Sequence, residues 1–229
     1  MAGAESGTGK FDEVASQYDD IHAKGMSPSG EPSGYFAQYK IDRLKRLSVT
    51  ADASVLDFGC GVGNVTELLA ENFSSVVGYD PSAGSLEVAR KRLPGLTFYS
   101  DENLLPRAEF DVVVLAGVMH HVSPDQRHAV ITRASDTLKA GGRLVVFEHN
   151  PYNPVTRRVV DNCPFDEDAI LLPPREVRSV LTAAGLDDVK QAFIVFFPHA
   201  LAFLRKLEPA IGFFPLGAQT MTVGVRRSE

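Results

Sequence analysis

The sequence predicts a doubly wound α/β fold, in which helices cover both faces of a mainly parallel sheet. Short β-rich runs alternate with helical patterns along most of the chain, which is typical of βαβ units. The β-rich runs, such as Asp111–Leu115, are almost continuously apolar, as expected of strands covered on both faces. A glycine-rich turn, Gly59–Gly63, joins the first of these runs to a helical pattern.

Seven runs of the sequence are expected to be strands. Five of them alternate with helical patterns, and the last two flank an apolar connection near the end of the chain. In order, they are Ser54–Gly59, Ser75–Asp80, Leu96–Ser100, Phe110–Gly117, Arg143–His149, Val189–Phe197 and Ala218–Arg226.

Five helical patterns connect these strands. Ser82 and Ser123 are suitable N-cap residues for two of them, and Gly141 and Gly142 are expected to stop the third helix. The predicted helices are Asn64–Asn72, Ser82–Leu93, Pro124–Lys139, Pro174–Ala184 and Ala200–Leu207.

Two segments interrupt this alternation. Residues 1–10 are small and polar and predict a flexible N-terminus, and residues 11–47 predict a helical lid made of two helices. Residues 48–229 form the expected main domain. Within it, the insert 150–174 contains five prolines and therefore cannot be one regular element. Both the lid and the insert are expected to cover a substrate.

Composition and charge narrow the class of protein. The 229 residues are 44% hydrophobic and 23% charged, with a formal net charge of -6. This composition suits one globular domain, and the acidic balance predicts no nucleic-acid partner. The two cysteines, Cys60 and Cys163, are too few for a thiolate metal site, so no metal is expected. Without an apolar signal segment or a membrane span, the sequence predicts a cytoplasmic protein.

The glycine turn follows an acid that ends the first predicted strand, Asp57. Backbone N–H groups at the start of the following helix favour polar or anionic ligand groups. Counted from Gly59, the sixth position is Asn64 and not glycine, so the turn departs from the dinucleotide fingerprint. A nicotinamide-dependent oxidoreductase therefore remains only an alternative. The second alternative is that the glycine turn only connects a strand to a helix and binds no ligand.

Acids also follow the next two predicted strands. Asp57, Asp80 and Asp101 end successive strands, which places them at one edge of a parallel sheet, where open α/β folds bind ligands. Asp80 can accept both hydroxyls of a ribose. Asp101 lies where the protein can recognise an adenine ring, or it simply caps the next turn.

Five segments in this order resemble the motifs of the class I S-adenosylmethionine-dependent methyltransferases. They are VLDFGCGVGNVT, VVGYD, SDENLL, FDVVVLAGVMHHV and LKAGGRLVVFEHNP. The resemblance covers roughly residues 18–224. It implies a Rossmann-like seven-stranded sheet with an antiparallel last strand inserted beside the sixth. It also implies S-adenosylmethionine as the cofactor and S-adenosylhomocysteine as the product.

The resemblance also implies roles for single residues. Asp80 would bind the ribose hydroxyls, Asp101 the adenine amino group, and the main chain at Ala116 would approach the methionyl end. The other expected cofactor residues hold the methionine portion or neighbour these positions: Asp57, Gly59, Cys60, Gly61, Gly63, Pro81 and Glu102. Cys60 is expected to be a spacer and not a nucleophile.

Methyl transfer from a sulfonium depends chiefly on alignment, which can supply about 7–11 kcal/mol in favourable cases. His120 or His121 is a candidate base after the fourth strand, or either one simply packs there. Glu148, His149 and Asn150 orient an acceptor or anchor the insert. The substrate and lid residues expected on this side are Tyr18, Tyr35, Tyr39, Glu148, His149 and Asn150.

The predicted function is methyl transfer to an O or N nucleophile of a small, natural-product or sugar-like acceptor. An RNA or protein acceptor is the alternative within the same chemistry. The chain is expected to be a monomer or a homodimer, without a membrane span.

Overall fold

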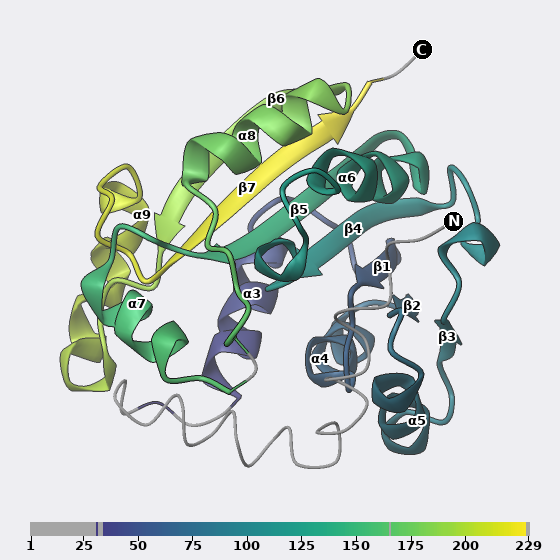
Figure 1. Cartoon of the computed structure of the whole chain (residues 1–229), viewed down its shortest axis with the longest axis horizontal. Coiled ribbons are helices and arrows are strands. Elements are labelled where there is room, and N and C mark those ends of the chain that lie inside the picture. Colours follow the sequence, from purple (N-terminus) through teal and green to yellow (C-terminus); the bar gives the residue numbers. More distant parts are fainter. Residues whose placement is uncertain (1–30, 32–33, 165, 228–229) are drawn as a thin grey trace.

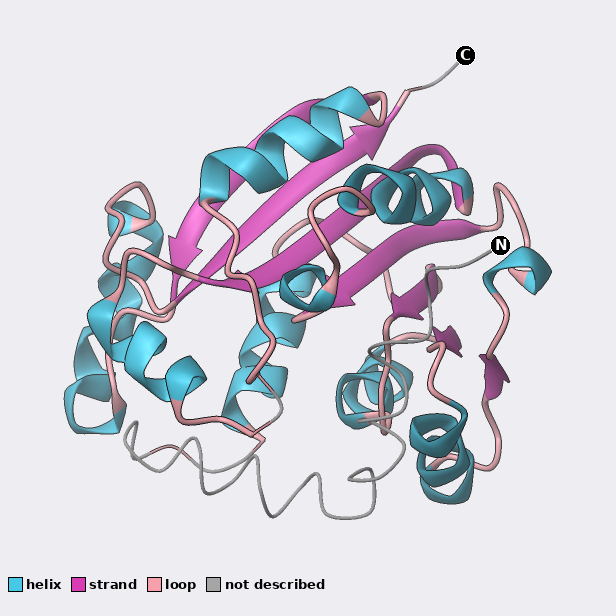
Figure 2. Cartoon of the chain, in the orientation of Figure 1, coloured by secondary structure: helices cyan, strands magenta, loops and turns pink. Residues whose placement is uncertain are grey.

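The computed structural model describes residues 31, 34–164 and 166–227, which form a seven-stranded sheet with helices on both faces (Figures 1 and 2). The strand order is β3-β2-β1-β4-β5-β7-β6. β7 is antiparallel to both of its neighbours, and the other pairs are parallel. The strands are β1 (Ser54–Phe58), β2 (Ser75–Tyr79), β3 (Thr97–Tyr99), β4 (Phe110–Ala116), β5 (Leu138–His149), β6 (Leu186–Ile194) and β7 (Gln219–Arg226). The predicted doubly wound sheet with its antiparallel last strand is confirmed.

Alternating residues of the strands belong to two apolar clusters, one on each face of the sheet. Leu56 of β1 belongs to the cluster beneath α6 and α8, whereas its neighbour Val55 belongs to the cluster beneath α3 and α4. The α-helices are α3 (Tyr35–Lys45), α4 (Asn64–Asn72), α5 (Ala83–Arg92), α6 (Arg127–Asp136), α7 (Pro154–Asp161), α8 (Pro174–Ala183) and α9 (Glu208–Ile211). The 3-10 helices are η3 (Glu102–Leu104), η4 (Met119–His121) and η5 (His199–Leu207). None of the helices described is both long and apolar enough to cross a membrane.

The glycine pair 141–142 does not stop a helix, so that prediction is wrong. α6 already ends at Asp136, and both glycines lie inside β5, where pairing with β4 shifts register. A Cβ on Gly142 would lie 2.9 Å from the carbonyl oxygen of Lys139. The two glycines therefore permit the irregularity in β5, where the backbone passes too close to its neighbours for a side chain to fit at Gly142.

Two further boundaries differ from the sequence prediction. β6 runs from Leu186 to Ile194, so it begins before the predicted Val189 and ends before Val195, whose φ of 61° departs from extended backbone. The predicted helix at Ala200–Leu207 is the 3-10 helix η5, which is kinked at Leu201. The insert contains α7, whose N-terminus is capped by the Asn153 side chain.

The lid prediction is only partly within the described residues. α3 is the second of the two helices expected there. Tyr18 and the first expected helix lie outside the described part of the chain.

We expect Gly217→Ala to destabilise the protein by about 1–3 kcal/mol, because the new methyl group would overlap backbone that cannot move freely. Its Cβ would lie 2.5 Å from the carbonyl oxygen of Ile194 and 2.7 Å from the Ile194 nitrogen. Gly95→Ala is the matched control, since a Cβ there meets nothing within 4 Å. Urea unfolding of both variants measures the effect, and equal stabilities would contradict the proposed overlap.

Candidate functional site

The candidate site lies at the carboxyl edge of the parallel strands. β1 pairs with β2 and β4, and β4 pairs with β5, all in parallel, so their carboxyl ends meet at one edge. The glycine turn follows β1, Asp80 follows β2, η4 follows β4, and Asn150 follows β5. The fold therefore brings together segments that are far apart in the sequence.

The turn after β1 requires its glycines. Gly59, Gly61 and Gly63 have φ values of 82°, 54° and 89°, all left-handed. A Cβ on Gly59 would also lie 2.5 Å from Val118. The N–H groups of Gly59 and Cys60 donate to the carbonyl oxygen of Tyr79, which ties the turn to β2. The main chain can therefore come close to a ligand without side-chain obstruction.

Two acids are fixed beside this turn. Asp57 is 1% exposed and accepts a hydrogen bond of 2.7 Å from the Thr66 hydroxyl. Burial, together with the neighbouring Asp80 charge, raises the pKa of Asp57 to about 7. Asp80 accepts bonds of 2.8 Å from the N–H groups of Gly61 and Ser82. These bonds hold its carboxylate at the end of β2, where the ribose is expected.

Asp101 and Cys60 occupy the positions expected from the sequence. Asp101 caps η3, because its Oδ1 accepts a bond of 2.9 Å from the Asn103 N–H. Its part in adenine binding stays a prediction, as does that of Glu102, whose carboxylate lies 3.6 Å from Arg133. Cys60 is buried, and burial raises the pKa of its thiol. A thiol held protonated is a poor nucleophile, which agrees with the spacer interpretation.

Lys40 is a site residue that the sequence prediction missed. It lies on α3, is 9% exposed, and its Nζ donates a long bond of 3.4 Å to the Phe36 carbonyl oxygen. Burial lowers the pKa of Lys40 to about 8, while the charges of Glu148 and Asp57 oppose that shift. α3 thus carries a buried cation toward the acids of the sheet edge. The signal in the sequence that could have identified Lys40 is its position on the same helix face as the apolar residues Phe36 and Leu44.

His120 is held between two carboxylates. Its Nδ1 lies 2.6 Å from Glu148 Oε2, and its Nε2 lies 3.3 Å from Asp166 Oδ1. The other Glu148 oxygen accepts a bond of 2.7 Å from the Met119 N–H. Burial lowers the pKa of His120, but the two carboxylates outweigh it and raise the pKa to about 9. His120 is therefore an imidazolium near neutral pH.

The neighbouring histidines, His121 and His149, are neutral near neutral pH. Burial and the charge of His120 lower the pKa of His121 and of His149 to about 4 each. The ring centroids of His120 and His121 are 4.1 Å apart. The two candidate bases are thus distinguished, because only His121 is neutral and has a partly exposed side chain.

Asn150 acts as an anchor for the insert. It is fully buried, and its Nδ2 donates to the carbonyl oxygens of Pro215 at 3.1 Å and Gly217 at 2.7 Å. Its Oδ1 accepts from the Tyr152 N–H at 3.0 Å. Of the two roles considered for the residues after β5, the anchoring role describes Asn150.

The two described lid tyrosines contact the C-terminal part of the chain. The Tyr39 hydroxyl donates to the Glu208 carboxylate, and the guanidinium of Arg205 lies 4.4 Å from the centre of the Tyr35 ring. Burial raises the pKa of both phenols, for Tyr35 to about 12. These contacts fix α3 against η5 and α9, and a role in acceptor binding stays a prediction.

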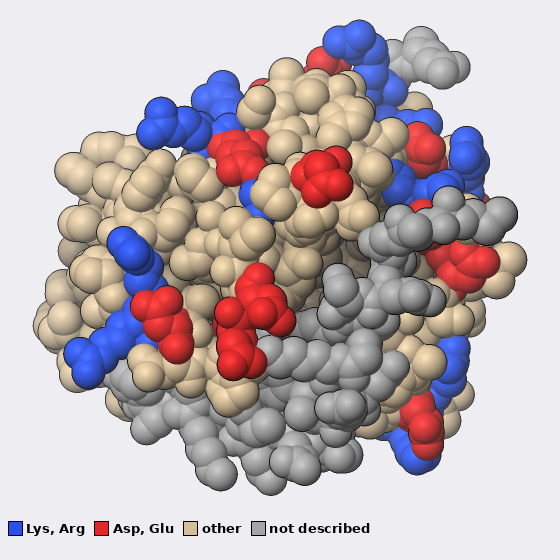
Figure 3. All heavy atoms as spheres, viewed as in Figure 1, with Lys and Arg blue, Asp and Glu red and all other residues tan. Residues whose placement is uncertain are grey.

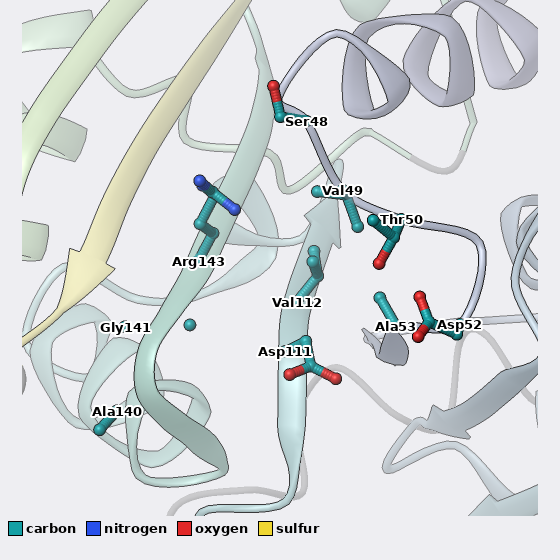
Figure 4. Close-up of a pocket in the computed structure, with 11 residues that line it drawn as sticks. Ser48, Val49, Thr50, Asp52, Ala53, Asp111, Val112, Ala140, Gly141 and Arg143 are labelled. Atoms are coloured by element: carbon teal, nitrogen blue, oxygen red, sulfur yellow. The ribbon is translucent and has the colours of Figure 1, made fainter.

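A polar pocket lies at the opposite edge of the sheet and is separate from this site. Figure 4 shows Asp52, Asp111 and Arg143 among the residues that line it. Asp111 accepts bonds from the Ser54 hydroxyl and from Lys139 there, at 2.7 Å and 2.9 Å. These groups lie at the amino ends of β1 and β4, away from the glycine turn.

Known proteins match the chain in this same region. A family model described as a methyltransferase domain matches residues 56–144. The trans-aconitate 2-methyltransferase of Methylobacterium nodulans is 35% identical over 136 residues, covering 54% of this chain and 50% of that protein. An uncharacterised methyltransferase of Geobacillus sp. is 31% identical over 144 residues, covering 60% and 64%. The matches thus span about half to two thirds of the length of these curated relatives.

Solved structures extend the likeness to nearly the whole chain. Phosphoethanolamine N-methyltransferase 2 of Haemonchus contortus has a TM-score of 0.67 at 17% identity, covering 98% of this chain and 61% of that one. A Thermotoga maritima S-adenosylmethionine-dependent methyltransferase, described as a possible histamine N-methyltransferase, has a TM-score of 0.66 at 18% identity, covering 96% and 99%. At these identities the likeness concerns the fold.

The fold is that of a doubly wound α/β protein, and the candidate site lies at the carboxyl edge of its parallel strands. The match to the methyltransferase-domain model and the methyltransferase relatives confirm the resemblance to the class I S-adenosylmethionine-dependent methyltransferases, and the solved structures confirm the fold.

We expect Asn150→Ala to lower the free energy of unfolding by about 2–4 kcal/mol, because the truncation leaves buried backbone groups without their partner. The measurement is chemical unfolding followed by circular dichroism. If Asn150 instead contacts the acceptor, the variant would keep its stability and lose acceptor affinity.

Proposed function

We propose that the chain transfers a methyl group from S-adenosylmethionine to an O or N nucleophile of a small-molecule acceptor. The observation that supports this most is the combination of the left-handed glycine turn with the Asp80 carboxylate fixed against it. A glycine turn without the neighbouring acid would fit many nucleotide ligands. The family match supports S-adenosylmethionine as the cofactor.

Two buried charges suit the methionyl end of this cofactor. An α-amino acid carries an ammonium and a carboxylate, and Asp57 on β1 and Lys40 on α3 offer the opposite charges. In this proposal Asp57 binds the ammonium and Lys40 binds the carboxylate. Buried, charge-assisted hydrogen bonds of this kind are stronger than those between neutral groups.

A small acceptor agrees better with the surface than RNA does. The formal net charge is -6, and on the face shown in Figure 3 the Lys and Arg side chains are interspersed with Asp and Glu. Phosphate backbones are bound by concentrated cations. Relatives named for trans-aconitate and phosphoethanolamine also support a small acceptor. Protein acceptors and nicotinamide chemistry have no comparable support.

The reaction in this proposal relies on alignment, with a weak base on the acceptor side. The donor methyl is already activated by the sulfonium, so the protein must chiefly place donor and nucleophile in line and exclude water. His121 is the candidate base, since His120 already holds a proton between Glu148 and Asp166. The acceptor's proton would pass to the neutral His121 imidazole as the carbon–nucleophile bond forms.

We expect Asp80→Ala to weaken S-adenosylhomocysteine binding by about 2–4 kcal/mol, which is roughly 30- to 1,000-fold, because two charge-assisted hydrogen bonds to the ribose are lost. Isothermal titration measures the affinity. Asp136→Ala, at the end of α6, is the control and should bind like the wild type. Unchanged affinity of the Asp80 variant would exclude the ribose assignment, and no binding by the wild type would exclude the proposed function.

We expect His121→Ala to lower kcat by about 10²- to 10⁴-fold, the usual contribution of a general base. Release of S-adenosylhomocysteine with a panel of small hydroxyl and amine acceptors measures turnover. A base with a pKa of about 4 is available throughout the neutral range, so the wild-type kcat should be level there. If kcat instead climbs toward the His120 pKa of about 9, His120 is the base.

A further inference from the structure

Three side chains from two distant segments converge after the carboxyl end of β4. His120 and His121 belong to η4, and Asp166 belongs to the insert after β5. One ligand atom from each residue lies within 4.8 Å of the other two. Among the described residues, they form a compact group of two imidazoles and one carboxylate.

The distances in this group are of two kinds. His120 Nδ1 lies 2.6 Å from Glu148, which is a short hydrogen bond. The Asp166 Oδ1 atom lies 3.3 Å from His120 Nε2 and 3.6 Å from His121 Nε2, longer than charged hydrogen bonds of about 2.7–2.9 Å. A tetrahedral ion with bonds of about 2.0–2.1 Å separates its ligand atoms by about 3.3–3.4 Å. Both longer distances are close to that spacing.

We propose that His120, His121 and Asp166 bind a divalent transition-metal ion such as Zn²⁺, through His120 Nε2, His121 Nε2 and Asp166 Oδ1, with the ion replacing the Nε2 proton of His120, which is released to solvent. Imidazole nitrogens with one carboxylate are a typical donor set for first-row transition metals, whereas Mg²⁺ and Ca²⁺ prefer oxygen ligands. Three protein ligands leave one tetrahedral position for an acceptor atom or for water.

The surroundings of His120 match those of a metal-bound histidine. A ligating histidine usually donates its second ring N–H to a carboxylate, which fixes the ring and its tautomer. Glu148 occupies this position on Nδ1, and its other oxygen is held by the Met119 N–H. Glu148 and Asp166 also supply two negative charges, which offset the charge of a divalent ion.

Metal binding would connect the insert to the sheet, because Asp166 and the two histidines come from different segments. It would also occupy the lone pair that His121 needs as a base. Added metal should therefore inhibit methyl transfer if His121 is the base. The metal-binding test itself needs no methyl acceptor, so it stands apart from the proposed function.

The test uses the untagged full chain, dialysed against a chelator and titrated with Zn²⁺ by calorimetry and with Co²⁺ by visible absorption. We expect one ion per chain and the d–d bands of a tetrahedral cobalt site. His121→Ala and Asp166→Asn should each weaken binding by at least 10-fold. Glu148→Gln should weaken it by about 10- to 100-fold, the usual effect of losing such a supporting carboxylate.

His128→Ala is the matched control, because His128 is an exposed histidine on α6. This variant should bind Zn²⁺ like the wild type. Thermal unfolding of each metal-free variant shows whether it is folded. Asp166→Asn keeps the shape of the side chain, so it still tests the proposal if His121→Ala does not fold. The proposal is overturned if the wild type binds no ion, or if the folded Asp166→Asn variant binds it with wild-type affinity and cobalt spectrum.

Discussion

The parallel pairing of β1 with both β2 and β4 is the constraint on which the site depends. Parallel strands must be joined by crossovers, so each strand returns to the same edge before its chain turns away. Asp57, the glycine turn and Asp80 consequently meet at that edge. The turn can be this tight only because Gly59 is left-handed and has no side chain to collide with Val118.

The edge concentrates ionisable groups that burial alone would neutralise. Asp57 and Lys40 both have pKa values displaced toward their neutral forms, as expected of charges taken from water. After β4, Glu148 and Asp166 keep His120 charged in spite of its burial. The site thus holds the His120 imidazolium between two carboxylates before a ligand arrives, which reduces the reorganisation that binding requires.

The insert is held in place by polar contacts more than by a core of its own. Asn150 binds backbone before β7, and the buried Arg127 donates to carbonyl oxygens of Val122 and Ile170, which joins the segment after η4 to the insert. Such bonds position an insert whose prolines prevent it from being one regular element, although it contains α7. They also explain how Asp166 reaches His120 from a segment without a strand.

The sequence by itself determined the strands of the sheet and the acids at the strand ends, because hydrophobic period and glycine position are local signals. The antiparallel last strand was predicted only by the resemblance to the methyltransferase family. It misassigned Gly141 and Gly142, since a glycine pair has the same appearance at a helix end and inside a bulged strand. Only the tertiary structure decided that Lys40 is buried where the charges of Glu148 and Asp57 act on it, that Asp166 meets His120, and that two adjacent histidines carry different charges. These features arise from burial and from partners distant in the sequence, and no local pattern encodes either.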